Sequence, residues 1–309
     1  MSARRVPAHL TQVTEATLYP EGAIMSFNVN TNTGAMAALQ SLTATTKSLS
    51  MTSSRITTGM NVSSTKDNSA AYTTAQSLRS DLGGLQAVTS SLARAKSVTD
   101  VAVAGAEQIS DIVNQMKAKA YQAADTGIDQ ASRDNINKDF TALRDQITTI
   151  VSASTFNGTN LLKASGGTVS ALQSLQDSDT TSPTTWQADS LAVANLGLDL
   201  GGSVVTVASG GNISSAALAT AMIDTLTTTQ TNLATSLSTL GSASRKIDAQ
   251  STFNSKLSDA IEAGIGNLVD ADLAKESAKL QALQVKQQLG VQALAIANQA
   301  PQTITSLFR

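Results

Sequence analysis

Leucine and isoleucine recur every seven positions in three separate parts of the chain. The repeats are Leu42, Leu49 and Ile56; Leu78, Leu85 and Leu92; and Leu226, Leu233, Leu240 and Ile247. A repeat of seven places these side chains in one narrow row along a helix, which is the width of a coiled-coil seam. The pattern therefore predicts long helices that pack lengthwise on a partner helix.

Glycine, proline and runs of polar residues indicate where these helices begin and end. The predicted helices cover about 32–58, 69–125, 130–153 and 214–262, and a last helix begins near Asp272. The fourth helix carries the longest repeat, and Met222, Leu237, Phe253, Leu257 and Ile261 widen its apolar face. An antiparallel return of the C-terminal half along the N-terminal half would bury both sets of apolar rows.

Short polar side chains in front of two helices are predicted caps. Asp67 or Ser69 stands before the second helix, and Asp270 or Asp272 stands before the last one. Such side chains accept hydrogen bonds from the free N–H groups of a first helical turn. Pro301 should bend or end the last helix, because proline lacks the N–H of an intrahelical bond.

Glycines interrupt two of the apolar rows. Gly83 and Gly84 each lower helix propensity by roughly 1 kcal/mol against alanine, so an uninterrupted second helix fits poorly there. Gly264 and Gly266 mark a predicted break before the last helix.

Residues 154–213 differ in kind from the parts on either side. Three glycine pairs punctuate them, and 156–160 is turn material. The runs 190–193 and 204–207 are strand candidates. We predict a mainly α fold: a long antiparallel helical coiled-coil bundle formed by both chain ends, with a small β-containing central insert.

Composition narrows the function classes. The 309 residues include no cysteine and one histidine, His9, and the net charge is -2. Disulfides, thiolate metal sites and a histidine base in the body of the chain are therefore excluded, and no basic field suggests nucleic acid. No apolar run is long enough to span a bilayer. We predict no catalytic, cofactor or metal site, and read Asp270, Asp272 and Glu276 as helix-start residues rather than metal ligands.

Residues 1–24 look unlike the rest of the chain. They contain two of the four prolines and the only histidine, without helical periodicity or the apolar core of a signal peptide. We expect Met25 to be the natural first residue and 1–24 to be a non-native or upstream extension.

Motifs near both ends resemble bacterial flagellin, the subunit of the flagellar filament. The resemblance covers about 25–162 and 251–309. It is most specific at 55–71, 155–162, 272–281 and 297–302, which include Thr155-Phe156-Asn157-Gly158-Thr159-Asn160-Leu161-Leu162 and Ala297-Asn298-Gln299-Ala300-Pro301-Gln302.

The resemblance implies a domain arrangement. Residues 25–58 with 268–309 would form an inner-core coiled-coil domain, and 59–68 would connect it to the rest. Residues 69–163 with 214–267 would form a helical rod, and 164–213 would be a variable insert exposed on the surface.

The resemblance also implies a structural subunit that is not an enzyme and polymerises into the flagellar filament for swimming. Export would use the type III route without a cleaved signal peptide, to an extracellular filament. Its partners would be other copies of itself, an export chaperone, and cap or junction proteins. Two alternatives stay open: a hook–filament junction protein, and a secreted surface adhesin that uses the insert.

The terminal helices are predicted to be marginal alone and to gain order by packing between subunits, because they are narrow and rich in serine and threonine. The residues expected to make these contacts are Met36, Leu39, Leu42, Leu49, Ile56, Leu273, Leu280, Leu283, Leu289, Leu294, Ile304 and Leu307.

Overall fold

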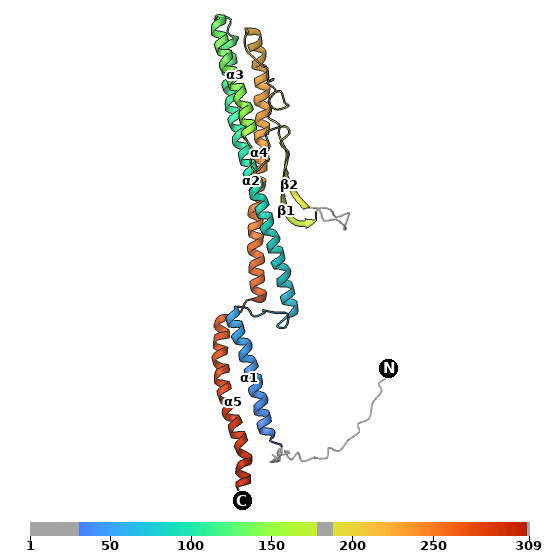
Figure 1. The fold of residues 1–309 in the computed structure, drawn as a ribbon, viewed down its shortest axis with the longest axis vertical. Helices are drawn as coiled ribbons and strands as arrows, with labels where there is room; N and C mark the ends of the chain where they lie inside the picture. The colour runs from blue at the N-terminus through green and yellow to red at the C-terminus, as the bar shows by residue number, and fades with distance from the viewer. Residues whose placement is uncertain (1–30, 178–187, 308–309) are drawn as a thin grey trace, which may run out of the picture. The chain divides into compact units, whose positions relative to one another are not determined.

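The structure is a computed structural model that describes residues 31–177 and 188–307. Its elements are α1 (Thr33–Thr58), α2 (Ser69–Ala124), α3 (Gln130–Ala153), β1 (Val169–Asp177), β2 (Ala188–Val193), α4 (Ala216–Val269) and α5 (Leu273–Leu307) (Figure 1). The predicted mainly α fold with a small β element is confirmed. The predictions for residues 1–24 lie outside the described residues.

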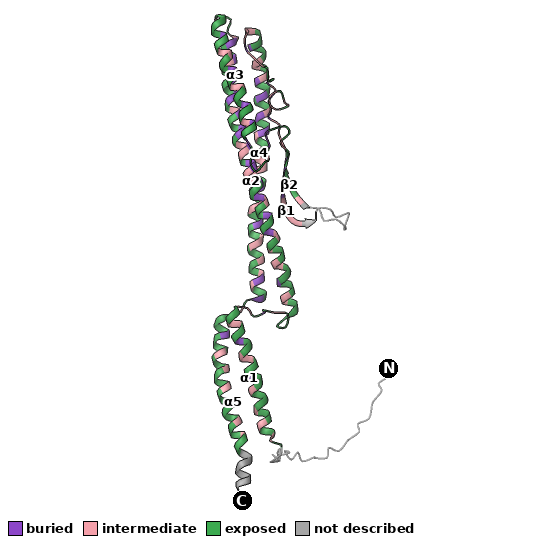
Figure 2. Cartoon of the chain, viewed as in Figure 1, coloured by how far each residue is buried: buried purple, intermediate pink, exposed green. Residues whose placement is uncertain are grey.

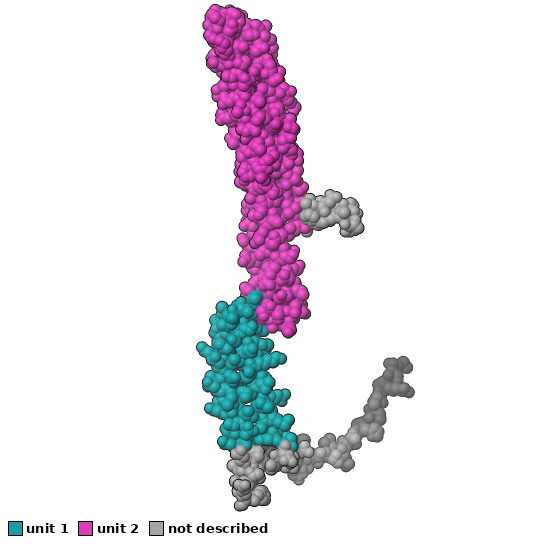
Figure 3. Space-filling view, viewed as in Figure 1, with its two compact units in different colours: residues 1–60, 271–309 teal, residues 61–270 magenta. Residues whose placement is uncertain are grey.

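The chain divides into two compact units (Figure 3). Unit 1 is assigned residues 1–60 and 271–309, and its described elements are α1 and α5. Unit 2 is residues 61–270 and holds the remaining elements. Each unit is built around one antiparallel helix pair, as the sequence predicted.

The core of unit 2 lies along α2 and α4. The heptad residues Leu92, Leu226, Leu233, Leu240 and Ile247 are 0–1% exposed, and buried positions follow both helices in Figure 2. The longest predicted repeat is therefore a real core row. Phe253 is an exception: it is 58% exposed, so its predicted place on the buried face is wrong.

Polar contacts set the alignment of α2 against α4. The buried Asn254 side chain donates to the Leu85 carbonyl at 2.9 Å, and Lys96 Nζ lies 2.8 Å from Asp248 Oδ1. Because a buried amide left unpaired is costly, the Asn254 bond disfavours sliding of one helix along the other.

A two-stranded antiparallel sheet packs against the helices of unit 2. Val169 pairs with Val193, and the register shifts between Leu172 and Asp177. Leu172 N donates to Ser91 Oγ on α2 at 3.0 Å. The strand predicted at 190–193 lies within β2, whereas β1 was not predicted.

The second strand candidate, 204–207, is not a strand. Val205 and Val207 are buried in the core of unit 2. Thr206 between them donates its N–H to Thr229 Oγ1 at 3.1 Å and its hydroxyl to the Thr225 carbonyl at 3.1 Å. The segment therefore docks on α4 instead of pairing with a neighbouring strand.

Both predicted glycine interruptions are wrong, since α2 and α4 run through them. A Cβ on Gly84 would lie 2.7 Å from Leu175 Cδ2, so this glycine lets β1 sit close to α2. Beyond Gly264 and Gly266, Ile265 and Val269 pack in a small second core. Tertiary burial therefore offsets the propensity cost of these glycines.

The caps differ in part from the prediction. Asn68, rather than Asp67 or Ser69, caps α2 by accepting from Ala71 N at 3.1 Å. Asp67 instead accepts from the Ser63 hydroxyl and from the backbone N–H groups of Ser63 and Ser64, and these bonds lower the pKa of its carboxyl. Asp272 caps α5, as predicted, by accepting from Ala274 N at 3.0 Å.

We predicted that Pro301 would bend or end the last helix. The helix continues past Pro301 to Leu307, so it does not end there. Pro301 cannot donate to the carbonyl of Ala297, four residues earlier. The Asn32 side-chain amide donates to that carbonyl instead, at 2.7 Å. A contact with α1 thus replaces the hydrogen bond that proline removes.

Candidate assembly surface

Unit 1 is a two-helix antiparallel pair that is tied at both ends. Asn32 reaches Ala297 at one end. At the other end, Arg55 Nη1 lies 3.3 Å from Glu276 Oε1, and Ala271 N donates to Gly59 O at 2.9 Å. These contacts fix which turn of α5 faces each turn of α1.

The seam between the helices follows heptad spacing on both sides. Its residues are buried or half-buried, and are Ala35, Ala38, Leu42, Thr45, Leu49, Thr52 and Ile56 on α1, and Glu276, Leu280, Leu283, Gln287, Gly290, Leu294 and Ala297 on α5. Small and polar residues occupy many of these positions. A Cβ on Gly290 would lie 3.2 Å from Leu42 Cδ1, so the helices approach closely there.

The predicted assembly residues separate into three groups in the structure. Six lie in the seam of unit 1: Leu42, Leu49, Ile56, Leu280, Leu283 and Leu294. Four are exposed: Met36, Leu39, Leu273 and Leu289. The remaining two, Ile304 and Leu307, lie in a part of α5 whose side chains the structure does not describe.

The exposed apolar residues of unit 1 form the candidate assembly surface, which we define as Met36, Leu39, Met51, Leu273, Val285, Leu289, Val291 and Ile296. Their exposed fractions are high for such side chains: 62% for Met36, 57% for Leu289 and 68% for Ile296. The sequence prediction missed Met51, Val285, Val291 and Ile296. The signal for Val285 and Ile296 was a second apolar face on α5, because Val285 lies four residues before Leu289 and Ile296 lies seven residues after it.

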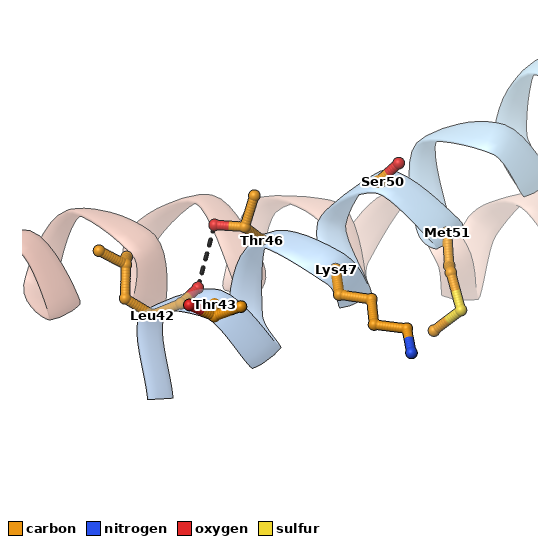
Figure 4. Close-up of a pocket in the computed structure, with 6 residues that line it drawn as sticks. All are labelled: Leu42, Thr43, Thr46, Lys47, Ser50 and Met51. Carbon is orange, nitrogen blue, oxygen red and sulfur yellow. Dashed lines mark hydrogen bonds between the residues drawn. The ribbon is translucent and has the colours of Figure 1, made fainter. Parts of the chain in front are cut away.

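A hollow of about 540 Å³ lies on α1 beside Met51 of this surface (Figure 4). Leu42, Thr46, Lys47 and Met51 line it, among others. The Thr46 hydroxyl donates to the Leu42 carbonyl at 3.0 Å. Because that donor is already paired within its own helix, a neighbouring apolar side chain could cover it at little desolvation cost.

The electrostatics of unit 1 centre on Glu276, which is buried. Burial raises the pKa of this carboxyl, but the Thr52 hydroxyl and the positive charges of Lys279 and Arg55 lower it by more, so the net pKa lies below its ordinary value. The enclosed Oε2 atom has no hydrogen-bond partner among the described residues. The Thr52 hydroxyl, Lys279 and Arg55 thus favour the ionised form of Glu276 against the effect of burial.

No group of three histidine, cysteine, aspartate or glutamate side chains in the described part of the chain could hold a metal ion. No helix in that part has the length and apolar character needed to cross a membrane.

Comparison with known proteins identifies the family. The chain matches the bacterial flagellin N-terminal helical region over residues 29–166 and the bacterial flagellin C-terminal helical region over residues 222–308. It is 45% identical to flagellin FljM of Caulobacter vibrioides over 282 residues, which cover 91% of this chain and 98% of that one.

The chain belongs to the bacterial flagellin family. A flagellin of Brucella melitensis is 36% identical over 91% of this chain and 99% of its own length. Flagellin A of Rhizobium meliloti is 29% identical over 91% of this chain and its entire length. Members of the family are structural subunits of the extracellular flagellar filament, and the two matched regions contain the helices of unit 1.

Proposed function

We propose that this flagellin polymerises through the candidate assembly surface of α1 and α5. The observation that carries the proposal is the exposure of the apolar residues Met36, Leu289 and Ile296 on a pair of helices whose seam is already occupied. α5 has apolar side chains both toward α1 and away from it, and a helix that is apolar on several sides is typical of a buried environment.

The energetics support assembly through these side chains. Full burial of an aliphatic side chain contributes roughly 1.5–3 kcal/mol. The candidate assembly surface holds eight such residues, and their summed burial can offset the ordering of two marginal helices only where neighbouring copies cover them. A filament needs contacts that repeat without closing, so different faces of one copy must meet those of the next.

The domain arrangement implied by the sequence is part of this proposal. Residues 25–58 with 268–309 are the inner core, 59–68 the connector, 69–163 with 214–267 the rod, and 164–213 the surface insert. Export without a cleaved signal peptide, and partners such as an export chaperone and cap or junction proteins, belong to it as well. No observation favours the hook-junction or adhesin alternatives.

A triple substitution tests the assembly surface: Val285, Leu289 and Ile296 changed to serine. The matched control changes to serine the exposed Gln284 and Gln288, which lie beside this row on the same helix. We expect the first variant to raise the concentration needed for polymerisation more than thirtyfold, because even 2 kcal/mol amounts to about that factor. The control should polymerise close to the unchanged chain, as measured by sedimentation and electron microscopy. Filaments from the apolar-to-serine variant at the unchanged concentration would contradict the proposal.

A further inference from the structure

The chain contains a single Asn-Gly pair, Asn157-Gly158, and it forms a tight turn after α3. Asn157 has φ 47° and Gly158 has φ 79°. Phe156 and Thr159 exchange two backbone hydrogen bonds of 3.0 Å across the pair. Two central residues with positive φ define a type I′ turn, for which Asn-Gly is the favoured sequence. Both residues are exposed to solvent.

The reactive groups of this pair are free in the described structure. Among the described residues, neither the Asn157 side-chain amide nor the Gly158 N–H has a hydrogen-bond partner. Glycine has no Cβ to hinder the approach of its nitrogen to the preceding side chain. A Cβ placed on Gly158 would meet nothing within 4 Å, so surrounding atoms leave the pair accessible to water.

Asn160, three residues later, shows the contrasting arrangement. It is buried, and its side-chain nitrogen donates to the Val151 carbonyl at 2.6 Å. Its side-chain oxygen accepts from Leu162 N at 2.8 Å and from Lys163 N at 3.0 Å. An amide held at both atoms and shielded from water is poorly placed to react.

We propose that Asn157 is a site of spontaneous deamidation. The Gly158 nitrogen gives up its proton to water or hydroxide and forms a bond to Asn157 Cγ. The bond from Cγ to the side-chain nitrogen breaks, and ammonia leaves after taking up a proton from solvent, which closes a five-membered succinimide ring. Water then adds to either ring carbonyl and opens it, leaving aspartate or isoaspartate. No oxidant or reductant is required.

The product would meet a cationic neighbour. Asn157 lines a polar hollow of about 250 Å³ together with Arg94, Thr159 and Ser170. Arg94 donates to Ser91 Oγ at 3.5 Å and has no carboxylate partner among the described residues. A carboxylate created at Asn157 would therefore gain a favourable charge neighbour. Isoaspartate would also add one carbon to the backbone of the turn and disrupt its paired hydrogen bonds.

The test follows the folded full-length chain during incubation at neutral and mildly alkaline pH. Tryptic peptide 145–163 contains both Asn157 and Asn160, so Asn160 is an internal control in the same mass spectrum. Digestion in heavy-oxygen water labels any aspartate or isoaspartate that forms during the digestion. Unlabelled product therefore formed before the digestion began. We expect the amide-to-acid mass shift at Asn157 alone, with a rate that rises with pH because the attacking nitrogen must lose its proton.

Two variants sharpen the result. Asn157→Gln should lose the mass shift, because its longer side chain would close a less favourable ring. Asn157→Asp should keep the helical circular dichroism of the unchanged chain, which shows that the acid is tolerated in the turn. Conversion at Asn157 in denatured but not in folded chain would overturn the proposal, as would equal conversion at Asn160.

Discussion

In unit 2, further layers cover the heptad rows of α2 and α4, whereas the described part of unit 1 consists of α1 and α5 packed on each other. In unit 2, α3 and the β1–β2 hairpin pack on the helix pair, and heptad residues such as Leu226 and Leu240 are fully buried. In unit 1, Leu42 and Leu294 at equivalent seam positions are only half-buried. The same heptad spacing therefore gives a fully buried row in unit 2 and a half-buried row in unit 1.

Both seams alternate aliphatic and small polar residues. Thr45 and Thr52 lie three positions after Leu42 and Leu49 in unit 1. In unit 2, Thr229 and Ser236 lie three positions after Leu226 and Leu233 and are buried as well. Two helices alone bury little surface, and polar seam residues reduce the gain further while favouring one register. The two units therefore differ in how many layers cover the seam, and on our proposal neighbouring copies supply the missing cover of unit 1.

The largest expected effect is the loss of a core side chain in unit 2. Leu233→Ala should destabilise unit 2 by about 2–5 kcal/mol, because it removes buried contacts and leaves a cavity. Leu42→Ala in unit 1 should cost about 1 kcal/mol in the unassembled chain, since Leu42 is only half-buried. Hydrogen exchange resolved by unit measures both. Equal losses of stability in the two units would contradict the difference in burial between them.

Substitutions at Gly83 and Gly84 of α2 test how closely β1 packs against that helix. Gly84→Ala should destabilise unit 2 by about 1–3 kcal/mol, because its Cβ would push into Leu175. Gly83→Ala should stabilise it by up to about 1 kcal/mol, since Gly83 is exposed and open space surrounds its Cβ position. Chemical denaturation of the two variants gives the sign of each change in the free energy of unfolding. A change of the same sign in both variants would show that contact with Leu175 does not exclude a side chain at position 84.

Two substitutions at Asn32 separate the contributions that its two hydrogen bonds make to the stability of unit 1. Asn32→Ala removes the cap on Ala35 N and the bond to the Ala297 carbonyl, and should cost about 1–2 kcal/mol. Asn32→Asp keeps the cap acceptor but cannot donate to Ala297, and should cost about 1 kcal/mol. Amide exchange at the ends of α1 and α5 measures the effect. If the aspartate variant behaves as the unchanged chain, Asn32 does not compensate for Pro301.

The smallest expected effect is the pH dependence of unit 1. The pKa of Glu276 is lowered from its ordinary value of 4.5, so its ionised form contributes stability above that value. The contribution is lost as the pH falls through the lowered pKa. Melting of the unassembled chain should therefore show a loss of α1–α5 order below about pH 4.5. Glu276→Gln is the control, and its unit 1 should lack this step. An identical step in both would assign the pH dependence to other carboxylates.

Heptad rows in the candidate assembly region could be predicted from the sequence, but the direction in which each row faces could not. Heptad spacing identified Leu42, Leu49 and Ile56 as one row, because the helical period is local. It could not tell a row facing α5 from a row facing solvent. All of these residues, with Met36 and Leu39, were therefore expected to contact neighbouring subunits, whereas the structure places Leu42, Leu49 and Ile56 in the seam with α5 and leaves Met36 and Leu39 exposed. The pairing of Arg55 with Glu276 was missed because 221 positions separate these residues.

The sequence by itself determined the helices, their approximate ends, their antiparallel return and the family, because periodicity, caps and motifs depend on residues close together in the chain. Only the tertiary structure decided that α2 passes through Gly84, that α5 passes through Pro301, and that 204–207 docks on a helix. In each of these places the outcome depended on a side chain or backbone group from a distant part of the chain. Leu175 fits against Gly84, Asn32 supplies the bond that Pro301 lacks, and Thr229 holds Thr206.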